Sequence, residues 1–187
     1  MNRISYIDIA GKKCPMNFSL GAVEEIGQRY GGLEEMQTAF SGIDKKPMHE
    51  ALGDLLWLLS VLLKYGAKYA ELVGTGDGRA YSAEDLAVLF GAEDAGTLSQ
   101  ALTAAMSMGT ATTLEVEDEP KKRGGHTGPV NPVWYQYYAL RNGHTPQRVP
   151  LIPFGEFADL LTATEWRQGT ARLKMPLDDE EIIPDVP

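Results

Sequence analysis

Apolar residues recur at spacings of three and four over residues 47–73, which is the pattern of a long helix. The middle of this segment, Leu55 to Leu63, is apolar on nearly every side and is interrupted only by Ser60. A helix that is apolar all round must be covered on all sides, so we expect it to be the central helix of an α-rich domain. The alternative is a transmembrane helix, but this apolar run is far shorter than the about 20 residues that a bilayer requires.

The chain ahead of this helix begins with the pattern of a β-hairpin. Residues 3–10 alternate β-branched or aromatic side chains with polar ones, which is typical of a strand. Residues 11–13 (Gly-Lys-Lys) indicate a turn and residues 14–18 the return strand, in which Pro15 marks a sheet edge. Because a two-stranded ribbon is not stable alone, we expect the hairpin to lie on the helices.

Shorter amphipathic patterns on both sides of the central segment predict further helices. Ser19 is suited to cap the first of them, and a Gly-Gly pair at 31–32 ends it. Ser82 and Asp85 have the spacing of a capping box at the start of another. The β-branched residues 110–116 predict a short strand or extended segment. The predicted helices cover residues 20–30, 33–40, 83–90 and 97–108.

Composition divides the chain into a larger domain and a smaller module. Residues 1–116 hold the predicted hairpin and the helices described so far. Residues 117–131 have almost no apolar content and several glycines and prolines, which indicates a flexible linker. Residues 132–174 form a small helical module, and residues 175–187 predict a disordered acidic tail. Such a tail can dock on a basic partner or simply keep the chain soluble.

The small module has two helical patterns, at residues 132–140 and 155–166, which together predict an αα-hairpin. A pair of helices this short cannot bury much core by itself. The predicted fold is therefore mainly α (α+β). A two-stranded N-terminal β-hairpin packs on a helical bundle with a long central helix, followed by a linker and a small C-terminal αα-hairpin.

Charge and cysteine content exclude several classes of function. The net charge is −9, which argues against binding of duplex DNA or of anionic membranes by the whole surface. The single cysteine excludes an internal disulfide and a cysteine-based zinc site, and it fits a reducing cytoplasm. The N-terminus lacks a continuous apolar region, so we expect no signal peptide.

Catalytic and metal-binding motifs are not evident in the sequence. The three histidines lie in different regions, without an H-x-x-x-H or H-E-x-x-H pair. The GTGDG run at 74–78 follows a helix and lacks the lysine and Ser/Thr of a phosphate-binding P-loop. No G-x-S-x-G motif occurs. We therefore expect no catalytic residues, no metal site and no cofactor.

A basic run and a group of aromatic residues lie close together in sequence. The run is PKKR at 120–123, and the aromatic residues are Trp134, Tyr135, Tyr137 and Tyr138. Bases of single-stranded nucleic acid can stack on such aromatic side chains. Trp134, Tyr137 and Tyr138, however, share one helix face, which is typical of core residues, and the positive charge is modest. A core is the favoured interpretation, and we expect no nucleic-acid binding.

Residues 6–36 read YIDIAGKKCPMNFSLGAVEEIGQRYGGLEEM. This pattern resembles the tail assembly chaperones of long-tailed bacteriophages: a hairpin ending in an apolar-Ser-Leu-Gly step, a helix with Glu-Glu, a Tyr-Gly stop, then a Leu-Glu-Glu helix and a long leucine-rich helix. The similarity covers about residues 4–108. The aromatic helix at 134–138 and the Gly-Glu-Phe-x-x-Leu-Leu step at 155–161 resemble the extension of longer family members, whereas the tail to Pro187 departs from the pattern.

The resemblance implies a non-enzymatic assembly factor in the host bacterial cytoplasm, absent from the mature virion. It would bind the tape measure protein through the helical domain and tail tube subunits through the extension, and it leaves homo-oligomerisation open. The longer family products often arise by ribosomal frameshifting, and Lys121-Lys122 is a candidate junction. The partner-binding candidates are Trp134, Tyr135, Tyr138, Phe154 and Phe157.

Two other functions compete with the chaperone hypothesis. A structural tail protein, such as a completion or adaptor subunit, would be retained in finished particles. A small enzyme or single-strand-binding protein would show a ligand-dependent thermal shift or salt-sensitive binding to nucleic acid.

Overall fold

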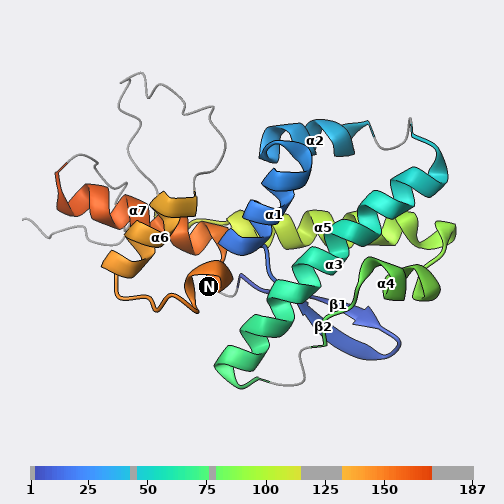
Figure 1. Ribbon diagram of the computed structural model, residues 1–187, viewed down its shortest axis with the longest axis horizontal. Helices are drawn as coiled ribbons and strands as arrows, with labels where there is room; N and C mark the ends of the chain where they lie inside the picture. Colours follow the sequence, from blue (N-terminus) through green and yellow to red (C-terminus); the bar gives the residue numbers. More distant parts are fainter. Residues whose placement is uncertain (1–2, 43–45, 76–78, 115–131, 170–187) are drawn as a thin grey trace, which may run out of the picture.

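The computed structural model describes residues 3–42, 46–75, 79–114 and 132–169. Within them, a two-stranded antiparallel hairpin packs on helices arranged around one long helix, α3 (Figure 1). This confirms the predicted mainly α fold. The strands are β1 (Ser5–Ile9) and β2 (Lys12–Met16). The helices are α1 (Leu20–Tyr30), α2 (Leu33–Ser41), α3 (Met48–Val73), α4 (Ala83–Leu89), α5 (Ala95–Thr110), α6 (Pro132–Arg141) and α7 (Phe154–Arg167), with short 3₁₀ helices η2 (Ala92–Asp94) and η3 (Val149–Leu151).

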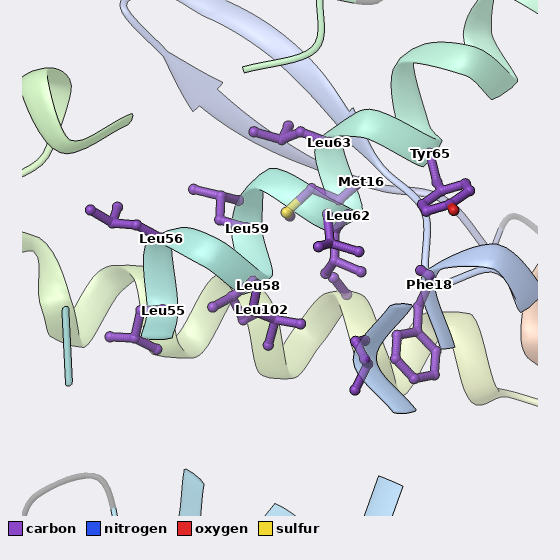
Figure 2. Packing of buried hydrophobic residues seen from close by; sticks show 14 of the residues in the cluster. Met16, Phe18, Leu55, Leu56, Leu58, Leu59, Leu62, Leu63, Tyr65 and Leu102 are labelled. Atoms are coloured by element: carbon purple, nitrogen blue, oxygen red, sulfur yellow. The ribbon is translucent and has the colours of Figure 1, made fainter. Parts of the chain in front are cut away.

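Helix α3 is the core helix that the apolar run predicts. Its leucines project toward both α5 and the hairpin (Figure 2). Leu55, Leu59 and Leu62 are each 3% exposed or less, and Leu102 of α5 is equally buried. Within the described part of the chain, no helix has the length and apolarity needed to cross a membrane.

The hairpin turn lies one residue earlier than the sequence predicts. It consists of Ala10 (φ 52°) and Gly11 (φ 78°), and β2 begins directly afterwards at Lys12. A two-residue turn with both φ values positive matches the right-handed twist of the strands, and a Gly at its second position relieves the strain. The Asp8 carboxylate accepts the Gly11 N–H at 2.8 Å and holds the turn.

The predicted helix caps are confirmed. The Ser19 hydroxyl accepts the Ala22 N–H at 3.4 Å at the start of α1. Ser82 and Asp85 form a reciprocal capping box at the start of α4, with bonds of 3.0 and 3.1 Å.

Of the two alternatives for residues 110–116, a short strand or an extended segment, the described part shows no strand. Thr110 belongs to α5, and residues 111–114 form no strand. The reason is that Thr113 and Leu114 donate their backbone N–H groups to the Asp159 carboxylate at 2.9 to 3.0 Å, so they are not available to a partner strand.

Helices α6 and α7 form the predicted αα-hairpin, but the structure joins it to the first domain. The Leu20 N–H donates to the Ile152 carbonyl, and the Phe154 N–H donates to the Phe18 carbonyl, both at 3.0 Å. Figure 1 accordingly places α7 next to α1, and α6 packs on α7. The apolar residues around η3 are covered by α1 because two short helices alone cannot bury them. The predicted linker at 117–131 and tail at 175–187 lie outside the described residues.

Candidate partner-binding surfaces

Two of the predicted partner-binding residues pack against each other instead. Phe157 is 2% exposed, and its ring meets the Tyr135 ring edge-on at a centroid distance of 4.8 Å. Burial also raises the pKa of the Tyr135 phenol. These two rings share a small core cluster with Leu20 and Ile152, so they attach the C-terminal helices to α1.

Phe154 has the same structural role at the start of α7. It is half-buried, and its ring lies edge-on to Phe18 at 6.3 Å. Phe154, Tyr135 and Phe157 therefore take part in the packing of the C-terminal helices, with Phe157 buried and the other two half-buried.

Trp134 lies differently, exposed on α6, whereas Tyr138 packs against the small core cluster. Trp134 is 59% exposed and stacks on half-buried Tyr138 at 6.1 Å, while Tyr137 is 49% exposed. The prediction that Trp134 and Tyr137 are core residues is therefore wrong, because α6 turns Tyr135 and Ala139 inward instead. The exposed large side chains, which we call the α6 aromatic face, are Val133, Trp134, Tyr137 and Leu140.

A pocket of about 210 Å³ adjoins this face. It opens where α6 and the turn before η3 meet α1, between Tyr135, Leu140 and Pro146 on one side and Leu20 on the other. Glu24 is the charged residue in its wall. Leu140 belongs to both the pocket and the α6 aromatic face, so the two form one continuous surface.

A larger apolar surface lies on the other half of the molecule, between α2, the start of α3, and α5. It consists of two hollows of about 330 and 320 Å³, and both are lined by Leu55 and Ser99. We call them together the α2–α3–α5 groove. The remaining lining residues are Met36, Gln37, Phe40, Leu102, Thr103 and Met106 in one hollow and Lys46, Met48, Ala51, Ala95 and Gly96 in the other.

The groove lining has the properties of a helix-binding surface. Met48 is 58% exposed, although its spacing along the helix predicts an inward position. Methionine side chains are flexible and polarisable, so they adapt to a partner of irregular shape. Ala95 and Gly96 leave room for another backbone to approach α5. An amphipathic helix binds such grooves through apolar side chains at spacings of three, four and seven residues.

Lys46, which lines the groove, is already paired. The Lys46 ammonium donates to Asp54 Oδ2 at 2.7 Å, and Arg29 donates to Asp54 Oδ1 at 2.9 Å. Burial raises the pKa of Asp54, but the bonds and charges of Lys46 and Arg29 outweigh it and hold the pKa below its ordinary value. Asp54 is therefore ionised at neutral pH and neutralises Lys46.

In the part of the chain that the structure describes, no three His, Cys, Asp or Glu side chains are grouped to hold a metal ion. His49 is exposed beside Glu50, with 3.9 Å between Nε2 and Oε1. The basic run at 120–123 and most of the glycine-rich loop, residues 76–78, lie outside the described residues.

Comparison with family models, curated proteins and solved structures finds no match for this chain. Inferences about function therefore rest on features of this structure: the helical core, the α6 aromatic face and the α2–α3–α5 groove.

Proposed function

We propose that this chain is a non-catalytic assembly chaperone of long phage tails that binds the tape measure protein. The observation that carries the proposal is the α2–α3–α5 groove, an open apolar channel on an otherwise well-packed helical protein. The choice of the tape measure protein as the partner comes from the resemblance of residues 6–36 to tail assembly chaperones. Tape measure proteins of such phages are long, helical and prone to aggregate.

The physical role of the groove is to cover an apolar stripe on a partner helix until that helix finds its place in the tail. Apolar contact supplies the affinity, since about 25 cal/mol is gained for each Å² removed from water. The chain's net charge of −9 keeps a crowded complex soluble. Such a factor acts in the host cytoplasm and is released before the particle is complete.

The α6 aromatic face is the surface we assign to tail tube subunits. Large exposed aromatic side chains such as Trp134 are the residue type that dominates binding energy at protein interfaces. Because α7 is bonded to the first domain, this face stands at a fixed position relative to the groove. We therefore propose that the two surfaces act together as one adaptor, in which the helices after the predicted linker pack on the first domain. The candidate frameshift junction, Lys121-Lys122, lies outside the described residues.

The test is co-expression of the full chain with the tape measure protein of the same phage, followed by pull-down. The proposal requires that the tape measure protein become soluble and remain bound. Met48→Ser, in the groove, should weaken the complex, whereas Leu72→Ser, at the other end of α3 and 50% exposed, should not. Failure of the unaltered chain to hold the tape measure protein would remove the proposal.

A second experiment separates the chaperone from a structural tail protein. Mass spectrometry of purified virions should not detect the chain if it leaves during assembly. Stoichiometric amounts of the chain in finished particles would instead favour a completion or adaptor subunit.

A further inference from the structure

The elements that form the α2–α3–α5 groove are strongly acidic. Helix α2, the first two turns of α3, and η2 with α5 together carry six carboxylates. They are Glu34, Glu35, Glu50, Asp54, Glu93 and Asp94. Among the described residues, Lys46 is the one lysine that lines the groove, and no arginine lines it.

Two of these acids are committed within the fold. Asp54 binds Lys46 and Arg29, and Asp94 accepts the Gly91 N–H at 2.9 Å. The four glutamates are exposed. In the described part of the chain, neither a lysine nor an arginine forms an ion pair with any of them.

The acidic character is local to this side of the molecule. The C-terminal helices and the turn between them hold equal numbers of described acids and arginines, namely Glu156, Asp159, Glu165, Arg141, Arg148 and Arg167. Within the described part of the chain, negative charge is therefore concentrated on the elements that form the groove.

We infer that the groove selects an amphipathic helix whose apolar stripe is flanked by lysine and arginine. This rests on the proposed function and specifies the chemistry of the partner segment. The apolar lining, including Met48 and Met106, supplies contact area for any amphipathic helix. The exposed glutamates of these elements attract a basic helix during its approach and repel an acidic one, so the charge of the flanking residues decides which amphipathic helix is accepted.

The experiment uses two labelled helical peptides of about 18 residues, or five turns, with the full chain and fluorescence anisotropy as the readout. Both peptides carry the same leucine and methionine stripe. One has lysine at every flanking position, and the other has glutamate. We expect the lysine peptide to bind at least about tenfold more tightly, and this preference to shrink in about 0.5 M salt because exposed charges are then screened.

Matched variants distinguish the effect of charges near the groove on peptide affinity from the effect of the overall negative charge. Glu34→Gln with Glu93→Gln removes two exposed charges from α2 and η2, the elements at the groove, and Glu71→Gln with Glu84→Gln removes two exposed charges from the far end of α3 and from α4. We expect the first pair to weaken the lysine peptide several-fold and the second to have little effect. Equal affinity for the two peptides, or equal effects of the two pairs, would overturn the inference.

These results are independent of the co-expression test. If the tape measure protein is held but the peptides are not distinguished, the charge selection is wrong and the chaperone function stands. If the lysine peptide is selected but the tape measure protein is not held, the groove binds a basic helix from a different partner.

Discussion

Asp159 joins three distant parts of the chain, so its replacement by alanine should destabilise the whole fold. Its carboxylate pairs with Arg3 near the N-terminus, and the side chains of this pair are only 10% and 12% exposed. It also accepts the Thr113 and Leu114 N–H groups after α5, and the Thr113 hydroxyl at 2.6 Å. Asp159 itself lies on α7.

The expected loss follows from what the substitution leaves behind. Asp159→Ala removes the carboxylate partner of the Arg3 guanidinium, which retains its bond to the Ala111 carbonyl at 2.8 Å, and it takes away the acceptor of two N–H groups in a largely buried interface. Removing one member of a buried, hydrogen-bonded pair typically costs 3–5 kcal/mol. The pair retains some contact with water, so we expect the free energy of unfolding to fall by about 3 kcal/mol, at the low end of this range. Asp159→Asn keeps an acceptor oxygen but loses the charge and should cost about 2 kcal/mol.

Urea unfolding is the assay, with the midpoint compared at constant m-value. Glu71→Ala, an exposed acid on α3, is the control and should change stability by about 0.5 kcal/mol or less. Hydrogen exchange of α7 is measured in parallel, since the substitution can also release the C-terminal helices without unfolding the rest. A loss below about 1 kcal/mol together with unchanged exchange in α7 would refute this account of Asp159.

The same carboxylate predicts a pH dependence. Burial raises the pKa of Asp159, but the bonds from Thr113 and Leu114 and the charge of Arg3 outweigh it, and the pKa lies below its ordinary value. A lowered pKa means that the stabilisation is complete above the unfolded-state pKa of about 3.9 and is lost as the pH falls through the folded-state pKa. Asp159→Asn should therefore flatten the acid limb of the stability curve.

Three further predictions follow from the packing. Gly155→Val places a Cβ 2.1 Å from the Ala111 carbonyl oxygen, so it should separate α7 from α5 and cost about 2 kcal/mol or more in urea unfolding. Asp54→Asn should cost about 1 kcal/mol at pH 7, and the difference should vanish in acid, because the lowered pKa of Asp54 confines its contribution to pH values above that pKa. Trp134→Ala should change the melting temperature little while abolishing retention of tail tube subunits in pull-down, since its side chain is exposed.

Local signals in the sequence predict local structure well here. The leucine run of α3 and the Ser82–Asp85 capping box are each contained in a few neighbouring residues, and both are confirmed. The turn at Ala10–Gly11 was misplaced by one residue because a positive φ at alanine has no sequence signal.

The long-range features could not be predicted. Nothing in the sequence links Asp159 to Arg3, which lies 156 positions away. The periodicity of α6 correctly groups Trp134 with Tyr137 on one face, yet it cannot say which face is buried, and the structure buries the other. The groove likewise depends on how α2 and α5 are placed beside α3, so Met48 and Met106 carry no individual signal.

The pairing of residues 17–20 with residues 151–154 also determines when this part of the fold can form during synthesis on the ribosome. The Asn17 amide donates to the Leu151 carbonyl, 134 positions later. At a synthesis rate of about 5–20 residues per second, the early segment waits on the order of ten seconds for its partner. During that interval Phe18 and Leu20 lack the cover that the finished protein gives them. The nascent chain therefore exposes apolar side chains that the finished protein buries. The rate of translation through the second half of the chain governs how long this exposure lasts.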